Sequence, residues 1–144
     1  MLWLSGVIAA TYGVFWVDGP QSLWRSTIKT LPIALLAVAA TWLGTWGLAI
    51  ALALSALGDY ALSYEGEKPF LIGLIAFALG HFVYVLLAVP LWQTVHWPMV
   101  VVLGLLAIST ARWLLPFTGA LKIPVAIYVL LICAMGVAAW GQSD

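Results

Sequence analysis

Three side chains that can carry acid–base chemistry lie inside apolar stretches of this chain: the carboxyl of Asp59, the imidazole of His81 and the phenol of Tyr84. An ionisable group within an apolar helix is costly in a bilayer, so each is expected to face protein or a water-filled cavity. His81 and Tyr84 are one turn apart and share a helix face. Ser55 and Ser63 lie four residues to either side of Asp59, so we expect their hydroxyls to hydrogen-bond its carboxyl. Burial disfavours the charged carboxylate, which makes Asp59 a candidate general acid.

Two cations and a further phenol are the candidate binding residues. Lys29 and Arg112 stand near the ends of apolar stretches, where long side chains can extend into the headgroup layer of a bilayer. Alternatively, they bind the phosphate of a lipid headgroup at the mouth of the cavity that holds Asp59. A structural alternative for Asp59 is a salt bridge to either cation. Tyr128 needs a partner for its hydroxyl, and it either lines the same cavity or only packs there.

The composition places the whole chain in a membrane. Of 144 residues, 65% are hydrophobic and 7% are charged, where a soluble domain has roughly 45–50% and about 25%. The formal net charge is zero, which leaves no basic excess for nucleic-acid binding. The single cysteine, Cys133, excludes an internal disulfide and a cysteine metal cluster, and two histidines make a three-ligand zinc site awkward. We therefore expect no metal and no cofactor.

Runs of 17–25 apolar residues, the length that crosses a bilayer core of about 30 Å, set the predicted architecture. We predict an all-α, polytopic integral membrane helical bundle of about six transmembrane helices, with residues 1–144 as a single transmembrane domain. The stretch from Gly44 to Gly47 contains two glycines and an interfacial tryptophan, so it is predicted to be a tight turn between the second and third spans. The predicted spans are 1–17, 30–43, 46–62, 70–92, 98–115 and 123–140.

The basic residues predict the orientation of these spans. With six spans, all five Lys and Arg residues fall on one side, which the positive-inside rule assigns to the cytoplasm. Both termini are then outside. Residues 1–17 lack the basic start and the cleavage site of a signal peptide, so they are expected to remain as a span. The predicted location is the plasma (inner) membrane of a bacterium.

At these residues the chain resembles the YhhN family, which contains lysoplasmalogenases and the transmembrane protein 86 branch. The most specific part is residues 55–62, Ser-Ala-Leu-Gly-Asp-Tyr-Ala-Leu, followed by Gly73 to Phe77 and by Gly-His-Phe-Val-Tyr at 80–84. These segments are similar to the family's Gly-Asp pair and its His-x-x-Tyr. Lys29 and Pro124-Val125 with Tyr128 are similar to further family positions. The resemblance runs from about residue 28 to residue 135.

The resemblance implies an enzyme that hydrolyses the vinyl ether bond of lysoplasmalogens to a fatty aldehyde and a glycerophospho-headgroup. Its partner would be a membrane lysophospholipid. Protonation of the vinyl ether forms an oxocarbenium ion that water traps, a step that needs an acid and a group to orient the water. In this hypothesis Asp59 is the general acid, His81 and Tyr84 position water or stabilise charge, and Lys29 or Arg112 binds phosphate.

The second acidic motif of the family and the function class both remain open at this point. Family members usually have about eight spans and a second acidic motif, Ser-Asp, in the seventh, so the chain is expected to lack the C-terminal spans. The letters Ser143-Asp144 are similar to that motif but follow the sixth span directly. The second acid is then dispensable, missing, or supplied by another chain in a homo-oligomer.

Other function classes are a small transporter or flippase and a non-catalytic membrane subunit whose polar residues only lock helices together.

Overall fold

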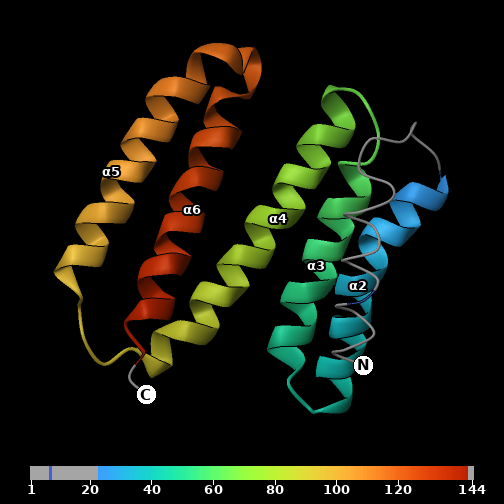
Figure 1. Ribbon diagram of the computed structural model, residues 1–144, viewed down its shortest axis with the longest axis horizontal. Coiled ribbons are helices and arrows are strands. Elements are labelled where there is room, and N and C mark those ends of the chain that lie inside the picture. Colours follow the sequence, from blue (N-terminus) through green and yellow to red (C-terminus); the bar gives the residue numbers. More distant parts are fainter. Residues whose placement is uncertain (1–6, 8–22, 143–144) are drawn as a thin grey trace. The chain divides into compact units, whose positions relative to one another are not determined.

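The helices of the computed structural model follow the predicted apolar runs closely (Figure 1). Residue 7 and residues 23–142 are described, so the predicted span 1–17, apart from residue 7, and the motif Ser143-Asp144 lie outside the described residues. The α-helices are α2 (Leu23–Trp42), α3 (Trp46–Ala61), α4 (Glu67–Ala88), α5 (Trp97–Leu114) and α6 (Lys122–Trp140). Three 3-10 turns, η1 (Val89–Leu91), η2 (Leu115–Phe117) and η3 (Gly119–Leu121), extend or join them. An all-α fold is confirmed for this part of the chain.

Among the described residues, three segments are long and apolar enough to cross a membrane: Glu67–Leu91, Trp97–Phe117 and Gly119–Trp140, of 25, 21 and 22 residues. They correspond to the predicted fourth, fifth and sixth spans. The helices at the predicted second and third spans are shorter apolar helices, Ser26–Trp42 and Trp46–Ala61 by the same criterion. The count of six spans is therefore supported only in part.

The buried and exposed residues are distributed as lipid contact requires. Most buried apolar side chains are those of alanine, whereas many Leu, Ile, Val, Phe and Trp side chains are exposed. A soluble protein buries its large apolar side chains, because water drives them inside. In a bilayer the lipid tails are as apolar as leucine, and small residues at helix contacts allow close approach of the backbones. This arrangement fits helices that face hydrocarbon.

The predicted turn between the second and third spans is confirmed. α2 ends at Trp42 because Gly44 adopts φ +74°, a left-handed conformation that ends helices at little cost for glycine. The amide and hydroxyl of Thr45 both donate to the Ala40 carbonyl, at 3.0 and 2.9 Å, which satisfies an end group of α2. α2 and α3 consequently pack against each other as a hairpin.

Two helix ends differ from the ends of the corresponding predicted spans. The second span was expected to begin at residue 30, after the charge of Lys29, but α2 begins at Leu23. A charged side chain does not interrupt the backbone hydrogen bonds of a helix, so the helix continues through it. The fourth span was expected to run to residue 92, but α4 ends at Ala88 and a 3-10 turn follows. Pro90 has no amide hydrogen for an α-helical bond, which accounts for the change.

The described helices form two compact units. The first comprises the α2–α3 hairpin and α4 as far as Gly80, and the second begins at His81 and contains the α5–α6 hairpin. Within the second unit, the connection between α4 and α5 is attached to the end of α6. The amides of Gln93 and Thr94 both donate to the Gly141 carbonyl, at 3.0 and 3.4 Å.

Candidate functional site

An ion pair between Lys29 and Asp59 is the central feature of the first unit. Lys29 Nζ lies 3.4 Å from Asp59 Oδ1, and the two side chains are 33% and 16% exposed. Lys29 stands thirteen residues before the last residue of α2, and Asp59 stands thirteen after the first residue of α3. The short turn at Gly44 therefore brings the two positions to the same level of the hairpin, about 20 Å from the turn at 1.5 Å per residue. Of the two cations considered for this carboxyl, the structure pairs it with Lys29.

The hydroxyls expected to contact the Asp59 carboxyl bond elsewhere. Ser55 Oγ donates to the Ala51 carbonyl at 3.0 Å, and Ser63 Oγ donates to the main-chain carbonyl of Asp59 at 2.9 Å. Each hydroxyl has one hydrogen to donate, and the carbonyl four residues earlier in the helix is its nearest acceptor. The prediction of serine hydrogen bonds to the carboxyl was therefore wrong.

Glycines bring α3 and α4 into close contact beside Asp59. A Cβ added at Gly58 would lie 2.7 Å from Phe77 Cδ2, and one added at Gly73 would lie 2.7 Å from Leu62 Cγ. At Gly80 the added atom would lie 3.2 Å from the Ala51 carbonyl oxygen. Gly73 and Gly80 therefore belong to a face of α4 that approaches α3 closely within this unit. Gly58 holds the helix of Asp59 against the ring of Phe77.

In the second unit, the rings of His81, Tyr84 and Tyr128 form a cluster. The ring centroid of His81 lies 6.4 Å from that of Tyr84, one turn along α4, and 5.5 Å from that of Tyr128 on α6. Both contacts are edge-to-face, with interplanar angles of 80° and 87°. All three side chains are half-buried. The sequence predicted the neighbours on α4, and the structure adds the contact with Tyr128 across helices.

Arg112 occupies the last turn of α5 with its side chain exposed. A cation there interacts favourably with the negative end of the helix dipole. Lys29 and Asp59 belong to the first unit. Arg112 and the ring cluster of His81, Tyr84 and Tyr128 belong to the second. A single cavity that contains both sets remains a prediction.

A tyrosine pair beside Asp59 was missed in the sequence. The hydroxyl of Tyr64 donates a hydrogen bond to the hydroxyl oxygen of Tyr60, with 2.7 Å between the oxygens. The two rings meet edge-to-face with centroids 5.3 Å apart. This hydrogen bond, followed in size by desolvation and by the charge of Tyr60, raises the pKa of Tyr64 above its ordinary value of 10.0. The four-residue spacing of the two tyrosines was the available signal.

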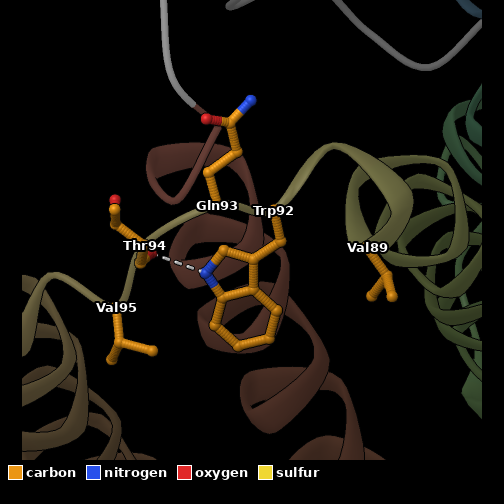
Figure 2. Close-up of a pocket in the computed structure, with 5 residues that line it drawn as sticks. All are labelled: Val89, Trp92, Gln93, Thr94 and Val95. Atoms are coloured by element: carbon orange, nitrogen blue, oxygen red, sulfur yellow. Dashed lines mark hydrogen bonds between the residues drawn. The ribbon is translucent and has the colours of Figure 1, made fainter.

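The connection between α4 and α5 contains a hollow of about 300 Å³ lined by residues 89 and 92–95. Figure 2 shows the Trp92 indole directed at the main chain of Thr94, to whose carbonyl it donates at 2.7 Å. Trp92 also lies against Gly141, where an added Cβ would overlap the indole. These contacts explain how the connection is held, and none involves a predicted site residue.

The possible metal ligands of the chain do not cluster in the described part. Nowhere in it do three His, Cys, Asp or Glu side chains come together in a way that could hold a metal ion. The predicted site residues of the described units bring together an ion pair in the first unit and an imidazole with two phenols in the second.

Helices of spanning length, small buried residues and large exposed apolar ones together define an integral membrane protein of the all-α class. The chain belongs to the YhhN family, whose model matches residues 24–144. This match includes every predicted site residue and extends beyond the resemblance seen in the sequence at both ends. The family is associated with hydrolase activity. Neither a curated protein nor a solved structure matches the chain.

Proposed function

We propose that this protein is an integral-membrane lipid hydrolase of the lysoplasmalogenase type. It would cleave the vinyl ether bond of a lysoplasmalogen, giving a fatty aldehyde and a glycerophospho-headgroup. The observation that carries the proposal is the Lys29–Asp59 pair in a hairpin of a YhhN-family chain. A carboxyl that is 16% exposed is accessible to a substrate, and its cation supplies a proton within reach.

The pair can hold the one proton that the reaction needs. With the proton on Lys29, the pair is ionic; transfer of that proton to Asp59 gives a neutral amine and a carboxylic acid. Asp59 would then protonate the β-carbon of the vinyl ether, leaving an oxocarbenium ion and a carboxylate. Water adds to the cationic carbon and loses a proton to the carboxylate. The resulting hemiacetal breaks its bond to the glycerol oxygen, which takes up a proton as the aldehyde leaves.

The rings of the second unit are the candidates for handling the water. The imidazole of His81 can accept or donate a hydrogen bond, and the phenols of Tyr84 and Tyr128 beside it can do the same. Because Lys29 is engaged with Asp59, Arg112 is the better candidate for the substrate phosphate. In this proposal the basic connections face the cytoplasm of a bacterial inner membrane.

Aldehyde release tests the proposal directly. Membranes that contain the full chain would be incubated with a lysoplasmalogen, beside membranes containing equal amounts of Asp59→Asn or Glu65→Gln. We expect aldehyde from the wild type, a loss of at least about 100-fold in Asp59→Asn, and unchanged release from Glu65→Gln. The control makes the same carboxyl-to-amide change at an exposed position. No aldehyde from the wild type, or equal release from Asp59→Asn, would refute the assignment.

The ion pair also favours a second candidate, a non-catalytic membrane subunit in which Lys29 and Asp59 only lock α2 to α3. The two candidates differ in what Asp59→Asn disturbs. For the hydrolase, turnover is lost while most of the purified variant remains folded at the assay temperature. For the subunit, the wild type releases no aldehyde and the substitution affects only stability.

A further inference from the structure

A second polar site lies at the end of the α5–α6 hairpin, within the second unit. A hollow of about 530 Å³ opens there. Two of its lining side chains are cations and the others are apolar. The lining residues are Ile108, Ala111, Arg112, Leu115, Pro116 and Lys122.

Local structure explains how the two cations reach one hollow. Arg112 is in the last turn of α5, and Lys122 is the first residue of α6. Two 3-10 turns reverse the chain between them, with Gly119 at φ +51°. Residues 108, 111 and 112 share one face of α5 by their spacing, and residue 115, the first of η2, follows them in the lining, so Arg112 sits at the edge of an apolar wall.

Among the described residues of the second unit, 81–142, no acidic side chain compensates the charge of this hollow. Arg112 and Lys122 are both exposed, and among the described residues neither forms an ion pair. The sequence from residue 69 to residue 143 contains no Asp or Glu. By contrast, Lys68 in the first turn of α4 follows Glu65 and Glu67 closely. Two like charges beside one hollow repel each other, and a bound anion would relieve that repulsion.

Aromatic side chains indicate the level of this hairpin end in a membrane. Trp113 and Phe117, 71% and 79% exposed, stand in the same segment with ring centroids 6.5 Å apart. Exposed aromatic side chains at the ends of spanning helices are typical of the headgroup layer. The apolar wall beside Arg112 then faces the upper part of the acyl chains.

We propose that this hollow binds a phospholipid whose phosphate lies between Arg112 and Lys122 and whose glycerol and first acyl carbons lie on the apolar wall. A guanidinium and an ammonium are the donors that bind phosphate best in proteins. Lys122 thereby becomes a binding residue that the sequence did not single out. That the bound lipid is also the one hydrolysed rests on the proposed function, whereas the binding does not.

Binding of phosphatidylglycerol to the full chain in dodecyl maltoside tests this site. We expect Arg112→Gln/Lys122→Gln to bind about 30-fold more weakly, since each basic residue near an anionic lipid adds roughly fivefold. Lys68→Gln, a matched charge loss at an exposed position in the first turn of α4, should bind as the wild type does. Arg112→Lys should keep most of the affinity. Equal binding by the double variant and the wild type would overturn the proposal.

Two further probes identify the ligand chemistry. Diacylglycerol lacks the phosphate and should not compete, whereas glycerol 3-phosphate lacks the chains and should compete at least about tenfold more weakly than the lipid. Competition by glycerol 3-phosphate as strong as that of the lipid would mean a site for free phosphate esters and would overturn the lipid assignment. Aldehyde release by the same samples separates the two proposals, because binding without turnover refutes only the hydrolase.

Discussion

The energetic coupling between Lys29 and Asp59 can be worked out from their geometry. At 3.4 Å, two unit charges attract by about 5 kcal/mol with an effective dielectric constant near 20. Partial desolvation of both groups offsets most of this, so we expect a coupling energy of about 1–2 kcal/mol in a double-mutant cycle. The single substitutions should be unequal. Lys29→Met leaves a charge on the less exposed partner, so it should destabilise more than Asp59→Asn.

Unfolding of the purified protein in mixed micelles by sodium dodecyl sulfate, followed by circular dichroism, measures these free energies. Wild type, Lys29→Met, Asp59→Asn and the double variant complete the cycle. Lys68→Met is the control, because this exposed lysine should change stability by no more than about 0.5 kcal/mol. Additive effects of the two single substitutions, within about 0.3 kcal/mol, would show that the contact carries no energy and would refute this reasoning.

Three further results are expected. Gly58→Ala should lower the unfolding free energy by about 1–3 kcal/mol because the added methyl meets the Phe77 ring, and Phe77→Leu in the same chain should recover part of the loss, as measured by the same titration. Gly44→Ala should cost about 1 kcal/mol through its positive φ alone, since the added atom meets nothing there; a larger loss would contradict that explanation. Tyr64 should ionise above pH 10 in ultraviolet difference titrations against Tyr64→Phe, and Tyr60→Phe should bring its pKa back toward the ordinary value. The hydrogen bond then stabilises the fold below pH 10 and is lost as the pH rises through the raised pKa of Tyr64; an unchanged titration in Tyr60→Phe would exclude this cause.

The fold was largely predictable because helices in apolar sequences are set by local properties. The length of the apolar runs, Pro90 and the glycine of the turn at Gly44 can be read directly from the sequence. α2 ends near Gly44 and α4 ends near Pro90. The start of α2 was not predictable from hydropathy, because Lys29 interrupts an apolar run without interrupting a helix. The number of spans depends on residues 1–17 as well, and these, apart from residue 7, lie outside the described part.

The sequence predicted which residues belong to the candidate site better than it predicted which of them contact each other. Residues on one helix, such as His81 and Tyr84, follow from spacing alone. The contact of His81 with Tyr128 joins residues 47 positions apart, which no local pattern encodes. The serine contacts failed because two acceptors competed for each hydroxyl and the main-chain carbonyl was closer in the helix. The sequence offered both Lys29 and Arg112 as partners for Asp59. The register of the α2–α3 hairpin places Lys29 beside it.

The attachment of the α4–α5 connection to Gly141 has a consequence for biosynthesis. Gln93 and Thr94 donate to a carbonyl that is synthesised nearly fifty residues later, after the whole of α6. Until then, the Trp92 indole also lacks the glycine surface against which it rests. The second unit therefore reaches its final structure only after Gly141 has been synthesised. A chain cut short before Gly141 would insert its helices but leave this connection unattached.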